Sequence, residues 1–160
     1  MPSSATPGSA RSVRLLLQRV TRAEVRVDGG VVGSIGGGLA VLVGVAHADT
    51  EAIADGMASK AVDLRIFRDA EGKTNRSLID IGGEMLAVSQ FTLFADARKG
   101  RRPSFIDAAP PDLGERLYER FVAAVEARGV TVARGVFGAE MEVDLVNDGP
   151  MTIWLDSAER

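Results

Sequence analysis

The segment Leu39–Ala46 constrains the fold most, because it consists only of apolar residues and glycine. A strand of this composition is typical of a sheet that is covered on both faces. The segment EMLAVSQF, residues 84–91, contains a second apolar run of the same kind. The chain is therefore predicted to fold in layers around a buried sheet.

Further strands are predicted where apolar residues alternate with polar ones or form short apolar runs. They cover residues 13–20, 23–28, 31–35, 131–137, 141–147 and 151–156. Asp28–Gly30 is a hairpin signal between two of them. The three glycines at 36–38 are interpreted as a flexible hairpin connection, and the segment 69–75, DAEGKTN, as a turn-rich loop.

Two helices are predicted between these strands. The first would be capped by Asp49 and would carry four apolar residues on one face. These are Ile53, Met57, Ala61 and Leu64. The second would follow Pro110-Pro111, with Asp112 and Glu115 as a capping box, and would end at Gly129. Two helices and about eight strands predict a mixed α/β domain.

The composition describes an ordinary globular protein of 160 residues with a net charge of −3. This length suits a single domain over residues 13–160. Residues 1–12 are small and polar, and are interpreted as a disordered extension or a sequence left by cloning. No apolar run approaches the roughly 20 residues of a membrane span, so no membrane partner is expected.

Several kinds of chemistry are excluded by the residue types present. The chain has no cysteine, which rules out disulfides and thiolate nucleophiles and fits a reducing compartment. Its one histidine, His47, is interpreted as a solvated loop residue. There is no G-x-S-x-G elbow, phosphate-binding loop or dinucleotide fingerprint. Any hydrolysis must therefore use backbone groups, hydroxyls or the substrate itself, and no metal or other cofactor is expected.

The segment Ser89–Leu93, SQFTL, stands where a buried strand ends. Strand ends are a common place for a site on a rigid scaffold, and exposed N–H groups there can stabilise an oxyanion. The alternative is a plain strand end whose hydroxyls bond to the local backbone. From the residues alone both interpretations stay open.

Asn147–Thr152, NDGPMT, lies between two predicted strands. A Gly-Pro pair in this position is usually a turn, although it can also project rigid carbonyls into a pocket. A third segment, 98–102, holds four cations in five residues of a net-acidic chain: Arg98, Lys99, Arg101 and Arg102. Such a cluster is either a solvated surface or a set of phosphate contacts.

Taken together, these segments resemble the D-aminoacyl-tRNA deacylases of bacteria and eukaryotes. The family is recognised by SQFTL followed much later by N-x-GP-x-T, and both are present at Ser89–Leu93 and Asn147–Thr152. LLQRVTRAEVRVDG, FRDAEGKTN, RRPSF and GVFGAEMEVDLVNDGP match as well. The resemblance covers residues 13–155. One position departs from it, since the residue after Gly149-Pro150 is most often valine and is Met151 in this chain.

The resemblance implies a three-layer β/β/α fold and a cytoplasmic homodimer whose active site lies at the subunit interface. It implies hydrolysis of D-aminoacyl-tRNA and of mischarged glycyl-tRNA. The site would be lined by Ser89, Gln90, Phe91 and Thr92. The tRNA would contact Phe137, Met141, Arg98, Lys99, Arg101 and Arg102.

The resemblance also implies a chiral filter that rejects L-aminoacyl groups. A cis Gly149-Pro150 bond would form it, with Asn147, Met151 and Thr152 around it, in a loop that reaches into the partner's pocket. Arg19 would help to hold this loop. The aminoacyl ester is labile, so orientation, oxyanion stabilisation and the ribose 2′-hydroxyl would replace a triad.

Two other functions are weighed against this one. A binding module that has lost catalysis is disfavoured by the presence of both motifs. A small-molecule hydrolase with Thr92 or Ser89 as nucleophile would need an activating base, and the sequence offers none near either residue.

Overall fold

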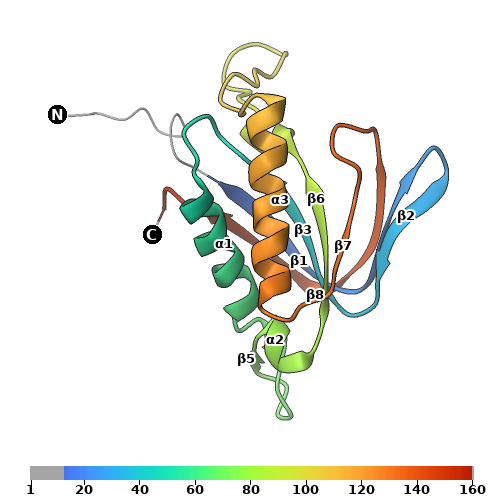
Figure 1. Cartoon of the computed structure of the whole chain (residues 1–160). Helices are drawn as coiled ribbons and strands as arrows, with labels where there is room; N and C mark the ends of the chain where they lie inside the picture. The colour runs from blue at the N-terminus through green and yellow to red at the C-terminus, as the bar shows by residue number, and fades with distance from the viewer. Residues whose placement is uncertain (1–12, 160) are drawn as a thin grey trace.

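Helices α1 (Glu51–Asp63) and α3 (Pro111–Ala127) lie side by side on one face of a six-stranded mixed sheet (Figure 1). The computed structural model describes residues 13–159. The predicted extension at 1–12 and the last residue, Arg160, lie outside this range. Within it, no helix is long and apolar enough to cross a membrane.

The sheet is organised around one long strand, β1 (Arg14–Val27). Strand β8 (Glu142–Asp156) runs antiparallel along one edge of β1, and β3 (Gly38–Gly44) and β2 (Gly30–Ile35) follow one another along the other. The glycines at 36–38 are therefore a bend between consecutive partners of β1, and the predicted hairpin at this point is wrong.

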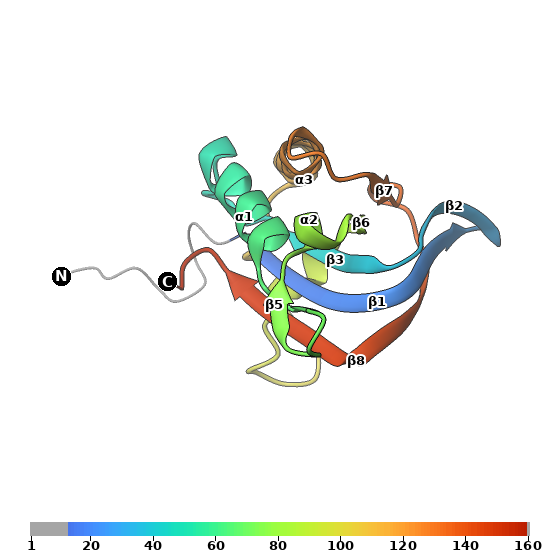
Figure 2. The same cartoon turned by 90° about the horizontal axis from the view of Figure 1, so that it is seen from below.

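Two parallel strands complete the sheet. β6 (Glu84–Ser89) pairs with β3, and β7 (Val132–Arg134) pairs with β6. Figure 2 shows how the sheet curves beneath the helices. The curvature brings β2 over β7, so closely that a Cβ on Gly33 would lie 2.7 Å from the carbonyl oxygen of Arg134.

Two apolar cores account for the layers. Alternate residues of β1 and β3, such as Leu17 and Val41, pack beneath α1 and α3. On the opposite face of the sheet, Val25, Ile35 and Leu86 pack between the two parts of the curved sheet. Helices, sheet and returning sheet form the three layers, so the predicted β/β/α class is confirmed.

Several predicted boundaries are wrong. The segments 13–20 and 23–28 belong to one strand, β1, and 141–147 and 151–156 belong to one strand, β8. The predicted strand 131–137 is reduced to β7. The predicted loop 69–75 lies within a small hairpin of β4 (Phe67–Arg68) and β5 (Thr74–Arg76).

The helix caps also differ from the prediction. Thr50, not Asp49, caps α1, because its side chain accepts the N–H of Ile53. α3 begins after Pro110 without a side-chain cap, so the capping box is wrong. Gly129 follows the end of α3 with φ +87°, as a terminating glycine requires. A short helix α2 (Leu78–Ile81) and the 3₁₀ helix η1 (Phe91–Phe94) were not predicted.

Candidate active site

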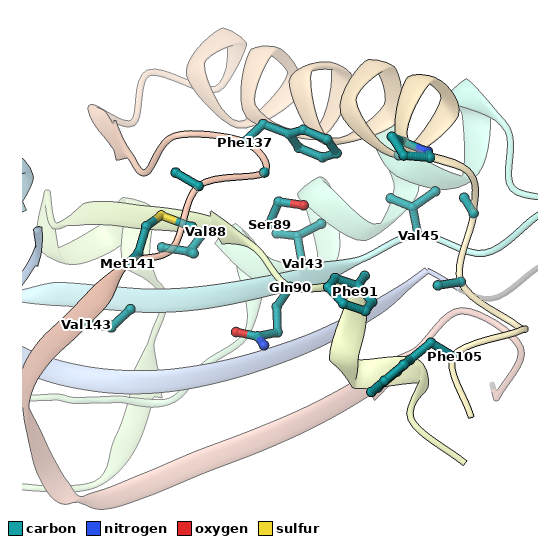
Figure 3. Close-up of a pocket in the computed structure, with 16 residues that line it drawn as sticks. Val43, Val45, Val88, Ser89, Gln90, Phe91, Phe105, Phe137, Met141 and Val143 are labelled. Atoms are coloured by element: carbon teal, nitrogen blue, oxygen red, sulfur yellow. The ribbon is translucent and has the colours of Figure 1, made fainter. Parts of the chain in front are cut away.

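A cavity of about 570 Å³ opens between the end of β6, the start of α3 and the segment after β7 (Figure 3). Its walls are mainly apolar, with two polar side chains, Ser89 and Gln90, on the strand side. The aromatic residues around it are Phe91, Phe105 and Phe137. A largely apolar cavity with few polar groups is typical of a small-molecule or substrate-end site.

Ser89 and Gln90 are positioned by a buried parallel strand pair. Ser89 is the last residue of β6 and pairs with Val43 of β3. The N–H of Gln90 donates to the carbonyl of Val43 at 2.8 Å, and the chain then turns into η1. Gly44 lets η1 fold over β3, because a Cβ there would lie 2.9 Å from the ring of Phe94. The strand end is therefore a rigid wall of the cavity.

The 3₁₀ helix supplies polar backbone groups next to Ser89. Phe91 and Thr92 begin η1, and the first N–H groups of a helix have no partner inside it. The Thr92 hydroxyl accepts a hydrogen bond from the side chain of Gln90. Thr92 thus stands behind Gln90 rather than among the described residues that line the cavity.

The opposite wall is formed by Phe137 and Met141. The Phe137 ring lies over Tyr118 of α3 with ring centroids 6.5 Å apart. Burial raises the pKa of Tyr118 to about 12, so its hydroxyl stays a donor and bonds to the carbonyl of Ala87 at 2.7 Å. Met141 packs so closely that a Cβ on Gly135 would lie 2.6 Å from its sulfur. Phe137 and Met141, two of the six predicted tRNA contacts, therefore face the predicted catalytic segment across the cavity.

The Gly-Pro segment is a bulge within β8, not a turn between two strands. Strand β8 keeps its register with β1 up to Val146, which pairs with Arg22; after a first shift Asn147 pairs with Val20, and pairing resumes from Thr152, which pairs with Gln18. The four residues between Asn147 and Thr152 face a single residue of β1, Arg19. We call these four residues, 148–151, the bulge.

Backbone geometry explains the residue types in the bulge. The Gly149-Pro150 peptide bond is cis, as the family resemblance implied. Gly149 has φ +127°, which favours glycine, and a Cβ there would lie 2.7 Å from the guanidinium of Arg19. The side-chain amide of Asn147 ties the two ends together by donating to the carbonyls of Arg19 at 3.0 Å and Met151 at 2.9 Å.

Two arginines, Arg19 and Arg68, bind residue 148 of the bulge. Arg19, only 4% exposed, donates through Nε to the carbonyl of Asp148 at 3.1 Å and through a terminal nitrogen to Ile66 at 2.6 Å. Arg68 of β4 binds both carboxylate oxygens of Asp148, at 2.9 and 3.1 Å. These hydrogen bonds and the charge of Arg19 lower the pKa of Asp148. No local pattern indicates this role of Arg68, because Asp148 lies 80 positions away.

The bulge does not reach the cavity of its own chain. None of the residues 147–152 is among the described residues that line it, and Gly149 and Pro150 are exposed. The structure therefore brings Ser89, Gln90, Phe91, Phe137 and Met141 together, and leaves the Gly-Pro segment apart from them.

The basic residues at 98–102 occupy the tip of an exposed loop. A bridge between Asp96 and Ser104 closes the base of this loop. Arg98 binds Asp96 at 2.7 and 2.8 Å and holds the pKa of that carboxyl at about 2. Within residues 13–159, Lys99, Arg101 and Arg102 take part in no ion pair, so their charges are available to an external anion.

Neither a catalytic triad nor a metal centre is present in the described part of the chain. His47 is exposed and its Nε2 lies 2.7 Å from the carbonyl of Ile106, in the loop beyond the basic tip. Among residues 13–159, no three His, Asp or Glu side chains gather in a way that could hold a metal ion.

The chain is similar to a family described as D-Tyr-tRNA(Tyr) deacylase, whose model matches residues 16–156. The D-aminoacyl-tRNA deacylase of Thermomicrobium roseum is 60% identical over 147 residues, covering 92% of this chain and 96% of that protein. That of Roseiflexus castenholzii is 58% identical over 146 residues, covering 91% and 93%.

Solved structures show the same fold. A protein named c-Myc DNA Unwinding Element Binding Protein has a TM-score of 0.83 and 39% identity, and the match covers 89% of this chain and 97% of that one. A structure described as a probable eukaryotic D-amino acid tRNA deacylase has a TM-score of 0.79 at 22% identity, covering 91% and 99%.

Proposed function

The chain belongs to the D-Tyr-tRNA(Tyr) deacylase family and is an ester hydrolase of D-aminoacyl-tRNA, and we propose that it works by RNA-assisted catalysis behind a chiral filter supplied by a partner subunit. The observation that carries this proposal is that the Gly149-Pro150 bulge lies apart from the cavity of its own chain. The strand end at Ser89–Phe91 lines the cavity, whereas the Gly149-Pro150 bulge stands exposed and outside it.

The aminoacyl end of the tRNA binds in the cavity, between the strand end and the opposite wall. Phe137 and Met141 offer an apolar surface for the terminal adenosine, and stacking of a base on an aromatic ring is a common mode of RNA binding. The ester then lies near Ser89 and Phe91. Glycine has no side chain to exclude, so glycyl esters are accepted as well.

Hydrolysis proceeds without a protein nucleophile. A water oxygen attacks the ester carbonyl carbon, the bond to the ribose 3′-oxygen breaks, and that oxygen receives a proton. The 2′-hydroxyl of the same ribose orients the water, and the N–H groups at the start of η1 stabilise the oxyanion. His47, the one imidazole of the chain, is bonded to the loop at Ile106 and takes no part.

Chirality is read by exclusion. The Gly149 and Pro150 carbonyls of one subunit enter the partner's cavity and occupy the space that an L side chain would need. A D side chain points away from them, so the enzyme accepts many D-amino acids without gripping their side chains. Rejection by collision gives specificity against the wrong substrate without tight binding of the right one.

The homodimer forms along β8. Within residues 13–159, β8 pairs only with β1 and leaves its other edge open. Val143, Val146 and Trp154 are exposed on this strand, at 39, 41 and 44%. An open edge with exposed apolar side chains invites pairing with another chain.

The basic loop tip guides the acceptor end. Lys99, Arg101 and Arg102 contact phosphates without reading sequence, as Arg98 would after release from Asp96. We further propose that residues 13–160 act as one domain in the cytoplasm, where aminoacyl-tRNA is used.

The test is a parallel incubation with D-tyrosyl-tRNA and L-tyrosyl-tRNA, following release of the amino acid. Rapid loss of the D-ester alone is expected. Binding of tRNA without loss of either ester would instead support a binding module, and equal loss of both would refute the filter.

A further inference from the structure

The bulge is held by two arginines that differ in what they bind. Arg19 is buried and donates to a backbone carbonyl of the bulge, and its Nε lies 3.4 Å from one carboxylate oxygen of Asp148, whereas Arg68 approaches from outside and binds both carboxylate oxygens of Asp148 with its two terminal nitrogens. Asp148 directly precedes Gly149. We propose that Arg68 is a positioning residue that sets the D-over-L selectivity of the hydrolysis through Asp148. This inference rests on the proposed function.

Arg68 projects from a stiff base. Its neighbour Phe67 is buried in the core beneath the helices. The next residue, Asp69, accepts the N–H groups of Glu71 and Lys73 at 2.8 and 2.9 Å and the side-chain amide of Asn75 at 2.9 Å. The β4–β5 hairpin therefore fixes the start of the Arg68 side chain, and a two-point bond transmits that position to Asp148.

A loosened bulge should affect hydrolysis of the L-ester and the D-ester differently. A filter that works by collision must hold its carbonyls in place against the push of an L side chain, and a displacement of the bulge would relieve that collision. A D side chain never meets the filter, so its hydrolysis does not depend on how firmly the bulge is held. Loss of Arg68 should therefore raise L-ester hydrolysis and leave D-ester hydrolysis nearly unchanged.

The experiment compares Arg68→Gln with a matched control, Arg120→Gln. Arg120 makes a similar two-point bond to Asp55, at 2.7 and 2.8 Å, with an exposed fraction of 44% against 48% for Arg68. That pair joins α1 to α3, so its loss tests the general cost of removing an exposed ion pair. Both esters are measured as kcat/KM for the wild type and each variant.

In Arg68→Gln we expect kcat/KM for L-tyrosyl-tRNA to rise about fivefold, the upper range for an exposed but two-point ion pair. The value for D-tyrosyl-tRNA should stay within about twofold. Arg68→Lys keeps the charge and loses the second terminal nitrogen, so its kcat/KM for L-tyrosyl-tRNA should lie between those of the wild type and Arg68→Gln. Arg120→Gln should keep the wild-type ratio.

An unchanged D-to-L ratio in Arg68→Gln, or an equal loss of both activities, overturns the inference while leaving the proposed function intact. A wild type that does not prefer the D-ester overturns the proposed function itself. Hydrogen exchange tests the holding role without activity: exchange at the Gly149 and Met151 amides should accelerate in Arg68→Gln and not in Arg120→Gln. Equal exchange in both variants contradicts the inference.

Discussion

Arg19 lies opposite the bulge of β8 and donates its Nε–H to the carbonyl of Asp148, 129 positions later in the chain. This bond joins the first strand of the fold to the Gly-Pro segment. Because the same guanidinium also binds the carbonyl of Ile66, it ties three distant parts of the chain together at one buried point.

Removal of this buried guanidinium should destabilise the fold. Arg19→Met keeps much of the side-chain length and leaves two carbonyls without their charged donor, so we expect a loss of about 2–4 kcal/mol in the free energy of unfolding. Denaturant unfolding measures it. Arg22→Met is the control, because the Arg22 side chain is 53% exposed and its removal should cost less than about 1 kcal/mol. Equal losses would contradict the structural role of Arg19.

Asn147 should control selectivity more than stability. Its amide bonds to both sides of the bulge, so Asn147→Ala frees the Gly149-Pro150 carbonyls to move. We expect L-tyrosyl-tRNA hydrolysis to increase by up to about thirtyfold, since two hydrogen bonds of about 1 kcal/mol each are lost. Asn147→Asp has the same shape without the N–H donors and should behave alike. A D-to-L ratio that is unchanged in both variants would show that the amide does not fix the filter.

The basic loop tip should contribute to tRNA affinity in proportion to its free charges. Arg101→Gln and Arg102→Gln together should weaken tRNA binding and reduce the slope of log K against log salt by about 1–2. Arg98→Gln is the matched control, because Arg98 is already paired with Asp96 and should change the slope less. Binding measured over a series of salt concentrations distinguishes the double variant from Arg98→Gln. Equal slopes in all variants would show that the loop tip does not contact the tRNA.

The Thr92 hydroxyl should not act as the nucleophile. It accepts a bond from Gln90 and stands outside the cavity lining described above. Thr92→Val should therefore retain D-aminoacyl-tRNA hydrolysis within about tenfold, whereas loss of a true nucleophile costs about 10⁴-fold or more. A loss of that size in the variant, with folding intact, would restore the alternative of a hydroxyl nucleophile.

Asp49 should make stability depend on pH. The carboxyl is 6% exposed, and its Oδ1 has no hydrogen-bond partner among the described residues. Burial raises its pKa from 3.8 to about 6. The folded protein therefore binds this proton more tightly than the unfolded chain, so the stability it contributes is present at low pH and is lost as pH rises from about 4 through 6.

The measurement is the free energy of unfolding between pH 4 and 8. Asp49→Asn removes the titration, so its advantage over the wild type should grow to about 3 kcal/mol near pH 7. Asp55→Asn is the opposite control, because the hydrogen bond from Arg120 lowers the pKa of Asp55 and its contribution appears as pH rises. A constant difference between wild type and Asp49→Asn would show that Asp49 does not titrate in this range.

The elements of the fold were predictable where one local pattern decides them. The apolar run at Leu39–Ala46 became the central strand β3, and the segment between Pro110-Pro111 and Gly129 became helix α3. The errors arose where strand boundaries depend on pairing with a distant strand. Asn147 and Thr152 look like the ends of two strands, yet both pair with β1, so the segment between them becomes a bulge.

The site divides in the same way. Ser89–Phe91 could be named as a candidate because a polar motif follows a buried strand, and these three residues line the cavity. Arg68 could not, since nothing near it in the sequence indicates a bond to Asp148. The cap at Thr50 was missed because Asp49, also a favourable cap residue, binds the N–H of Ala46 instead.

The central claim, that the bulge of one subunit serves the cavity of the other, is tested most directly in a mixed dimer. One subunit carries Ala109→Trp, which fills its own cavity and keeps its bulge. The other carries Asn147→Ala, which keeps its cavity and loosens its bulge. Different affinity tags isolate the heterodimer for assay with both esters.

In this heterodimer the one open cavity receives the intact bulge from the partner. The account predicts that it hydrolyses D-tyrosyl-tRNA and rejects L-tyrosyl-tRNA as the wild type does. Hydrolysis of the L-ester at the rate of the Asn147→Ala homodimer would mean that each bulge serves its own cavity, and would contradict the account.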